Sequence, residues 1–126
     1  LSYEMKILND GEPFEEFTRF LSEHMHDGRL SFDGIFCVTD KLAYLIIKTL
    51  HRLNLRVPED VQVIGFDGIR VFPGTEYVCS TIVQPVPEIA EMCVNLLLQE
   101  NMSAKPPLVC LPVTYVSGGT TREGKI

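Results

Sequence analysis

Two periods of hydrophobic and polar positions alternate along this chain of 126 residues. Apolar residues that recur every three or four positions predict amphipathic helices at residues 13–26, 40–53 and 85–101. Shorter runs, apolar throughout or loosely alternating, predict strands at residues 3–8, 35–38, 61–66, 77–83 and 108–116. The run 35–38 is apolar at every position, which is typical of a strand buried on both faces.

The resulting order is β-α-β-α-β-β-α-β. This alternation predicts an α/β fold, with an open, mainly parallel sheet flanked by helices and joined by right-handed crossovers. The chain has no initiator Met and its first expected strand begins almost at once. We therefore expect a fragment of a longer protein.

The helix expected at 40–53 carries more apolar surface than one buried face needs. Its core stripe consists of Leu42, Leu45, Ile46, Thr49, Leu50 and Leu53. Ala43, Tyr44 and Ile47 add apolar surface beyond that stripe. Either the helix is sandwiched inside the domain or its outer face meets a partner chain. We favour a partner, because three basic residues indicate that part of the helix is exposed to solvent: Lys41, Lys48 and Arg52.

The composition is that of an ordinary globular domain, with 45% hydrophobic and 22% charged residues. Eleven Lys and Arg against 17 Asp and Glu give a formal net charge of −6. A chain this acidic, without a basic stripe, repels phosphate backbones, which argues against direct nucleic-acid binding by this segment.

Neither a metal nor another cofactor is expected. The four cysteines lie in apolar runs and form no C-x-x-C pair: Cys37, Cys79, Cys93 and Cys110. We expect buried thiols in a reducing compartment, which favours a cytoplasmic location. His24 and His26 fall two positions apart on the first expected helix. They point about 200° apart, so they cannot share a metal from that helix.

Polar residues follow two of the expected strands. Thr39 and Asp40 come after the run 35–38, and Asp67 ends the run 61–66. In open parallel sheets, ligands bind outside the carboxyl ends of the strands, so these side chains can converge on a small polar ligand such as a sugar. For Asp40 we favour a different role, as the cap of the helix that starts there. Asp67 either binds ligand, which we favour, or merely ends its strand.

Catalysis by Asp40 and Asp67 is the competing interpretation, because paired carboxylates can do general acid–base chemistry. The chain has no G-x-S-x-G nucleophile motif, no phosphate-binding glycine loop and no visible nucleophile–base pair. We therefore expect no catalytic residues.

Residues 33–84 resemble the effector-binding domain of the lactose-repressor/galactose-repressor family of transcription regulators. The resemblance is strongest in DGIFCVTDKLAYLIIKTLHRLNLRVPEDVQVIGFDG. This segment has the family's strand ending in Asn-Asp or Thr-Asp, its helix, its RVPEDV-like turn and its strand ending in Gly-Phe/Tyr-Asp. Residues 80–85 match the family's Thr-Thr-x-x-Gln-Pro crossover, and 113–116 suit its closing strand. The C-terminal end resembles the sucrose-operon repressors of that family.

The resemblance implies a periplasmic-binding-protein-like fold of two lobes with a sugar or sugar phosphate between them. Residues 1–126 would be mostly the C-terminal lobe, and the helix 85–101 would pack in the absent N-terminal lobe. Its apolar stripe would then be uncovered and would find another apolar surface through a dimer or a swap. Effector contacts carry over to Thr39, Asp40, Asp67 and Gln84. A homodimer surface carries over to Tyr44, Leu45, Ile47, Lys48, Pro73 and Gly74.

The same resemblance places operator-DNA binding in a helix-turn-helix that this chain lacks. Two departures affect the identity of the ligand. Gly68 stands where many members have a second Asp, and Ser117 or Gly118 stands where the family has an Arg. The alternatives to a repressor are a sugar-binding protein of an uptake system and a small α/β enzyme.

Overall fold

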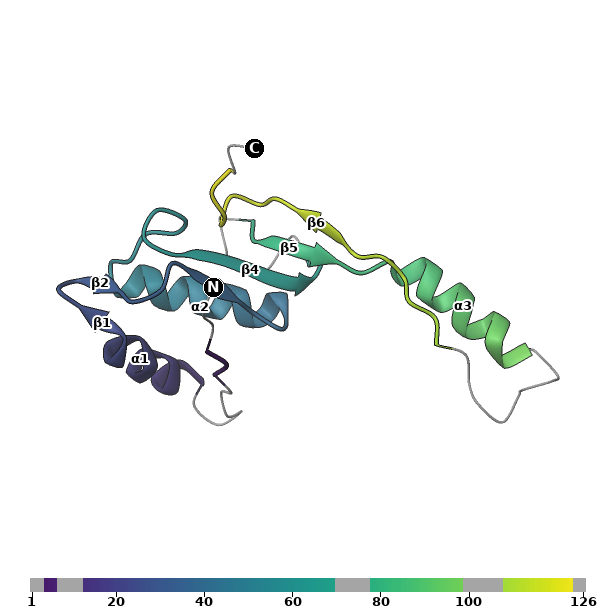
Figure 1. Cartoon of the computed structure of the whole chain (residues 1–126), viewed down its shortest axis with the longest axis horizontal. Coiled ribbons are helices and arrows are strands. Elements are labelled where there is room, and N and C mark those ends of the chain that lie inside the picture. The colour runs from purple at the N-terminus through teal and green to yellow at the C-terminus, as the bar shows by residue number, and fades with distance from the viewer. Residues whose placement is uncertain (1–3, 7–12, 70–77, 99–107, 124–126) are drawn as a thin grey trace.

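The computed structural model describes residues 4–6, 13–69, 78–98 and 108–123. Its elements in chain order are α1 (Pro13–Glu23), β1 (Met25–His26), β2 (Arg29–Leu30), β3 (Gly34–Phe36), α2 (Asp40–Arg52), β4 (Gln62–Asp67), β5 (Ser80–Val83), α3 (Val86–Leu98) and β6 (Thr114–Val116). The main sheet has the order β3-β4-β5-β6, in which the first three strands are parallel and β6 is antiparallel to β5 (Figure 1). The predicted α/β fold with a mainly parallel sheet is confirmed.

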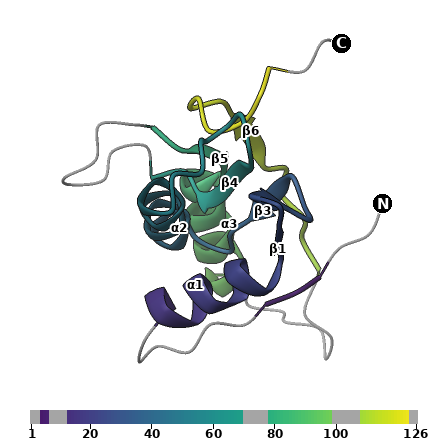
Figure 2. The ribbon, with the colours of Figure 1, turned by 90° about the vertical axis from the view of Figure 1, so that its left-hand side faces the viewer.

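Helix α2 covers one face of the sheet, and α1 packs against α2 (Figure 2). The core between them is formed by apolar side chains from both helices and from the strands. Its buried members include Phe17, Leu21, Cys37, Ala43, Tyr44, Ile47, Leu50, Val63 and Cys79. Because α2 touches the sheet on one side and α1 on another, it needs two apolar faces.

This packing corrects the expected dimer surface. Tyr44 is 2% exposed and Ile47 is 1% exposed, so neither can face a partner chain. The Tyr44 hydroxyl also accepts a hydrogen bond from the backbone N–H of Cys79 at 3.2 Å. The sandwiched alternative is therefore the right one for these two residues. Leu45 is half-buried and Lys48 is exposed, and their part in a dimer stays a prediction. Pro73 and Gly74 lie outside the described residues.

A small hairpin replaces the end of the first expected helix. Helix α1 ends at Glu23, and β1 and β2 pair across a turn at Asp27 and Gly28. These two residues have φ values of 50° and 74°, which suit the left-handed turns that join hairpin strands. His24 and His26 are therefore not on a common helix. The His24 ring instead lies 4.2 Å from the Phe20 ring, centroid to centroid, and its Nδ1 is 2.8 Å from the Phe20 carbonyl oxygen.

The sheet face opposite α2 is open in the described part of the chain. Phe36 is 59% exposed and Val38 is 69% exposed, so the expectation that the run 35–38 is buried on both faces is wrong. On this face the rings of Phe36 and Phe66 meet edge to face at 6.5 Å. Residues 4–6 form no strand, and the last expected strand shortens to Thr114–Val116.

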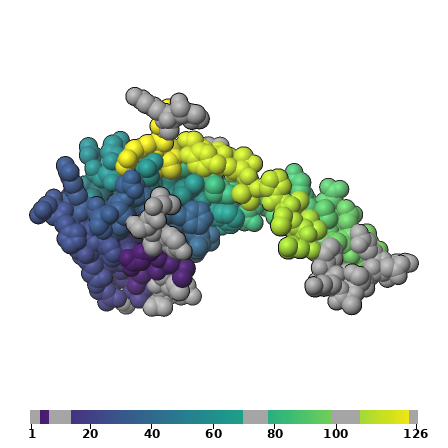
Figure 3. Space-filling model, in the orientation of Figure 1, coloured from purple at the N-terminus to yellow at the C-terminus, as the bar shows by residue number. Residues whose placement is uncertain are grey.

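Helix α3 lies beyond the carboxyl end of the sheet and has no buried residue (Figures 1 and 3). The chain then returns beside it and pairs β6 with β5. Cys93 on α3 and Cys110 on the returning segment are exposed, so only Cys37 and Cys79 fit the expectation of buried thiols. Packing of α3 in another lobe stays a prediction. No helix in the described ranges is long and apolar enough to cross a membrane.

Candidate ligand-binding site at the carboxyl edge

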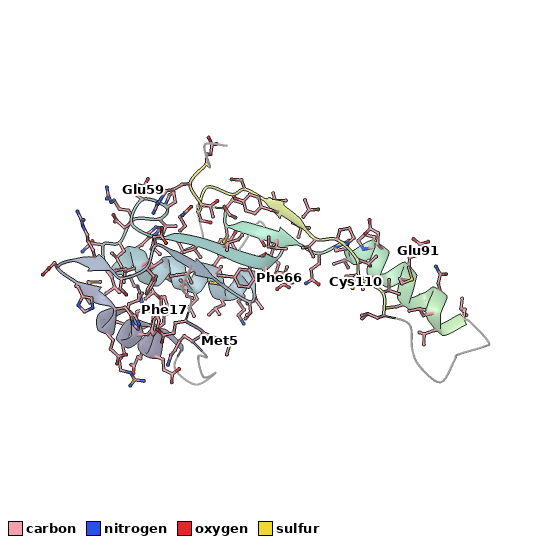
Figure 4. The ribbon with its side chains drawn as sticks, viewed as in Figure 1. Met5, Phe17, Glu59, Phe66, Glu91 and Cys110 are labelled. Atoms are coloured by element: carbon pink, nitrogen blue, oxygen red, sulfur yellow. The ribbon has the colours of Figure 1, made fainter. Side chains whose placement is uncertain are left out.

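Parallel pairing brings the carboxyl ends of three strands, β3, β4 and β5, to one edge of the sheet. Phe36 pairs with Ile64 between β3 and β4, and Asp67 pairs with Val83 between β4 and β5. Thr39 follows β3, Asp67 ends β4 and Gln84 follows β5. The labels of Phe66 and Glu59 in Figure 4 mark this edge and the opposite, amino end of β4. The polar residues predicted from the strand ends therefore share the carboxyl edge.

Asp67 and Gln84 are in direct contact. The Gln84 side chain donates from Nε2 to Oδ1 of Asp67 at 2.9 Å, and both side chains are half-buried. No hydrogen bond from a described residue reaches the other carboxylate oxygen of Asp67, Oδ2. Asp67 has a φ of 116°, a left-handed conformation that costs a non-glycine residue about 1–3 kcal/mol. The pair can therefore offer a carboxylate oxygen and an amide oxygen to ligand hydroxyl groups.

Thr39, not Asp40, caps helix α2. The backbone of Thr39 is extended, and its Oγ1 accepts a hydrogen bond from the N–H of Leu42 at 3.2 Å. The predicted cap at Asp40 is therefore one residue too late. Among the described residues, the Thr39 oxygen bonds to the helix and the Gln84 amide bonds to Asp67, so Thr39 stands apart from that hydrogen-bonded pair.

Asp40 is buried completely and points into the domain. Its Oδ1 accepts from the Thr81 hydroxyl at 2.6 Å, and its Oδ2 accepts from the backbone N–H of Ile69. The Thr81 Oγ1 also accepts from the N–H of Gly68 at 3.3 Å. The expectation that Asp40 touches the ligand does not fit this burial, because both oxygens already hold protein donors.

Gly65 makes room for this carboxylate. A Cβ on Gly65 would lie 2.1 Å from Oδ1 of Asp40, a distance that no side chain tolerates. Sequence reasoning did not single out Gly65 or Thr81. A glycine inside an apolar strand indicates a close approach by another group, so the signal for Gly65 was present.

The C-terminal segment fixes the other end of the strands. The Thr120 hydroxyl donates to the Val63 carbonyl at 2.7 Å and accepts from the Ser80 N–H at 2.8 Å. A Cβ on Gly118 would lie 2.4 Å from the backbone of Cys79. Gly118 therefore lies beside the start of β5, whereas Gln84 follows the end of that strand. The position at which the resemblance expects an Arg, Ser117 or Gly118, is thus at the opposite end of β5 from Gln84.

The two buried thiols, Cys37 and Cys79, have raised pKa values. Burial raises the pKa of Cys37 to about 12, with smaller contributions from Cys79 and Asp40. Burial also raises the pKa of Cys79. Within the described ranges, no group of three or more His, Cys, Asp or Glu could hold a metal ion.

In the described part of the chain, the carboxyl edge presents exposed apolar side chains beside the pair of Asp67 and Gln84. Two hollows of about 440 and 340 Å³ lie elsewhere, one beside the β1–β2 hairpin and one between α2 and residues 118–120. At the edge, Phe36, Val38 and Ile69 are exposed apolar side chains. Small-molecule sites combine such apolar surface with a few polar groups. The edge has both kinds of group and could form one wall of such a site.

Comparison with known proteins identifies relatives over most of the chain. Residues 6–121 match the family described as periplasmic binding protein-like domain. The sucrose operon repressor of Pediococcus pentosaceus is 36% identical over 92 residues, which cover 71% of this chain and 28% of the repressor. The ribose operon repressor of Lactococcus lactis is 30% identical over 112 residues, which cover 87% of this chain and 34% of that protein.

A solved structure has the same fold. The LacI family transcriptional regulator from Arthrobacter sp. FB24, in complex with lactose, is 28% identical and superimposes with a TM-score of 0.66. The match covers 86% of this chain and 40% of that regulator. The chain thus spans roughly 28–40% of the length of these relatives.

Proposed function

The chain belongs to the periplasmic binding protein-like domain family, and we propose that it is part of the sugar-sensing domain of a transcriptional repressor. Its resemblance to the lactose-repressor/galactose-repressor family, drawn from residues 33–84, is confirmed by the sucrose and ribose operon repressors among its relatives. Those relatives are transcriptional repressors, and we propose no enzymatic activity for this chain.

The observation that carries the proposal is the contact between Asp67 and Gln84 at the carboxyl edge. Two residues from different strands converge there, and Oδ2 of Asp67 faces no donor from the described residues. A carboxylate accepts hydrogen bonds from adjacent hydroxyl groups, which is the chemistry that a sugar offers. Thr39 stands at the same edge, with its oxygen accepting from the helix and its O–H able to donate.

The mechanism that follows is a population shift. A sugar held between this edge and a second lobe favours one angle between the lobes. In a homodimer that angle changes the affinity of distant DNA-reading parts for the operator. The net charge of −6 argues against DNA contact by this segment, so the proposal assigns that contact to another part of a cytoplasmic protein.

Calorimetry with the intact protein tests this proposal, with sucrose and ribose as the sugars. We expect one of them to bind, and Asp67→Asn to weaken binding by roughly tenfold to a hundredfold, because hydrogen bonds to a charged acceptor contribute about 1.5–3 kcal/mol. Asp33→Asn is the matched control, since Asp33 is exposed just before β3, at the amino edge. Equal binding by the two variants would show that Asp67 is not a ligand contact. An intact protein that binds neither sugar would contradict the proposed function.

A further inference from the structure

We propose that Asp40 is a positioning residue, whose carboxylate holds the turn after β4 so that Asp67 is oriented toward the ligand. The inference rests on the proposed sugar-sensing function, because it assigns Asp67 as a ligand contact. It gives Asp40 a role that differs from both a helix cap and a ligand contact.

The two peptide groups that follow Asp67 are both held by this network. Asp40 accepts directly from the N–H of Ile69. It also accepts from the Thr81 hydroxyl at 2.6 Å, and the same hydroxyl oxygen accepts from the N–H of Gly68 at 3.3 Å. One buried carboxylate on α2 therefore fixes the turn through one direct contact and one contact relayed by β5.

The turn needs this support because its backbone is strained. Asp67 and Gly68 have φ values of 116° and 86°, two consecutive residues in the left-handed region. Glycine adopts that region freely, whereas an aspartate does so only when its surroundings hold it there. A turn released from Asp40 can relax Asp67 to an ordinary conformation, and the direction of its carboxylate then changes.

Complete burial of Asp40 makes the network sensitive to the loss of a hydrogen-bond donor. Asp40 is fully buried, and the ion pairs of Glu4 with His24 and of Arg56 with Asp60 do not involve it. Among the described residues, its two oxygens accept from the Ile69 N–H and the Thr81 hydroxyl, which replace the hydrogen bonds to water that burial removes. Removing the hydroxyl leaves the carboxylate short of a donor and the Gly68 N–H short of an acceptor.

The test compares two buried threonines in the intact protein. Thr81→Val removes the relay, and Thr81→Ser keeps its hydroxyl. Thr49→Val is the matched control, because Thr49 is 1% exposed and its hydroxyl donates only to the Leu45 carbonyl within α2, at 2.9 Å. Asp40→Asn perturbs the network from its other side.

Hydrogen exchange at the amides of Gly68 and Ile69 is the first readout, and it needs no ligand. We expect Thr81→Val and Asp40→Asn to speed this exchange by about tenfold or more, whereas Thr81→Ser and Thr49→Val leave it nearly unchanged. Unchanged exchange at both amides in Thr81→Val would overturn the proposal, whether or not any sugar binds.

Sugar affinity is the second readout, with sucrose and ribose as probes. We expect Thr81→Val to weaken binding by about tenfold, Thr81→Ser to restore it, and Thr49→Val to leave it unchanged even where it lowers stability. Equal weakening by Thr81→Val and Thr49→Val would mean a general loss of stability and would overturn the positioning role. If the unmodified protein binds neither sugar, the proposed function fails, and the exchange measurement still decides whether Asp40 holds the turn.

Discussion

Gly65 lies in the middle of β4, against the carboxylate of Asp40. Glycine weakens a strand by roughly 0.5–1 kcal/mol relative to alanine, so its presence needs a compensating reason. The reason is space, because an added Cβ would lie 2.1 Å from Oδ1 and 3.2 Å from the Cα of Asp40. The absence of a side chain at Gly65 therefore allows the carboxylate of Asp40 to occupy its position beside β4.

Gly65→Ala is therefore expected to destabilise the protein by about 1–3 kcal/mol, since the new methyl must push Asp40 away from Thr81. Urea denaturation of the intact protein measures this difference. The control is Gly34→Ala in β3, where an added Cβ meets nothing within 4 Å and stability should hold or rise slightly. Equal unfolding midpoints for the two variants would contradict the predicted clash.

At the scale of elements, local signals predicted most of the secondary structure. Helix α2 was predicted at 40–53 and spans Asp40–Arg52, because its apolar period is strong and Asn54 ends it in a left-handed conformation. The first helix was predicted too long, because Asp27 and Gly28 turn the chain into a hairpin. The hairpin strands have two residues each, which is too short for a periodic pattern to show.

The candidate site was predicted only where it depends on strand ends. Asp67 ends the apolar run 61–66, and the sequence therefore located it correctly at the carboxyl edge. The partners of Asp40 come from 29 and 41 residues further along the chain, so no local pattern could indicate them. Burial of Tyr44 and Ile47 was missed for the same reason, because Tyr44 meets Cys79, 35 residues further along the chain, and Ile47 lines a hollow with Val78.

The loop between α2 and β4 contains an ion pair that titrates in acid. Arg56 donates from Nε and Nη2 to Asp60 at 2.9 and 2.6 Å, and its backbone N–H donates to the same carboxylate. These hydrogen bonds lower the pKa of Asp60 from 3.8 to about 2. The folded state thus gains from the charged form, and that gain is present above pH 3.8 and lost as the pH falls through about 2.

Asp60→Asn should therefore lower stability at neutral pH and lose less further stability than the unmodified protein as the pH falls from 4 toward 2, an interval of about two units. Denaturation midpoints measured across that range check the prediction. Glu59→Gln removes the same charge one residue away, without these side-chain hydrogen bonds, and serves as the control. Identical pH profiles for Asp60→Asn and the unmodified protein would show that the pair does not contribute.

At the scale of the whole molecule, the structure divides into a packed body and the helix α3, which projects away from it. Figure 3 shows the narrow connection between them, formed by the chain that leaves β5 and the chain that returns to β6. Leu97 and Leu98 on α3 are 83% and 74% exposed. Apolar surface of this kind marks an interaction site, and in the proposed repressor a second lobe would cover it.

The chain by itself is therefore expected to self-associate through α3. Light scattering at high concentration should show a dimer or larger species, and Leu97→Glu should shift it toward monomer, because a charge on that face resists burial. Lys48→Glu on α2 is a control that changes an exposed residue away from α3. A strictly monomeric unmodified chain would contradict the prediction.

The hydroxyl of Thr120 has a consequence for how the domain assembles. Its bond to the Val63 carbonyl closes a loop of 57 residues, about twice the 29 residues between Asp40 and Ile69. Doubling a loop costs only about 0.6 kcal/mol at equilibrium, but distant contacts slow folding much more strongly. On a ribosome, the Asp40 network can form once Thr81 has emerged, whereas the amino end of the sheet stays unpinned until Thr120 follows. The amino end of the sheet is thus a late product of synthesis, whereas the Asp40 network at the binding edge needs no residue after Thr81.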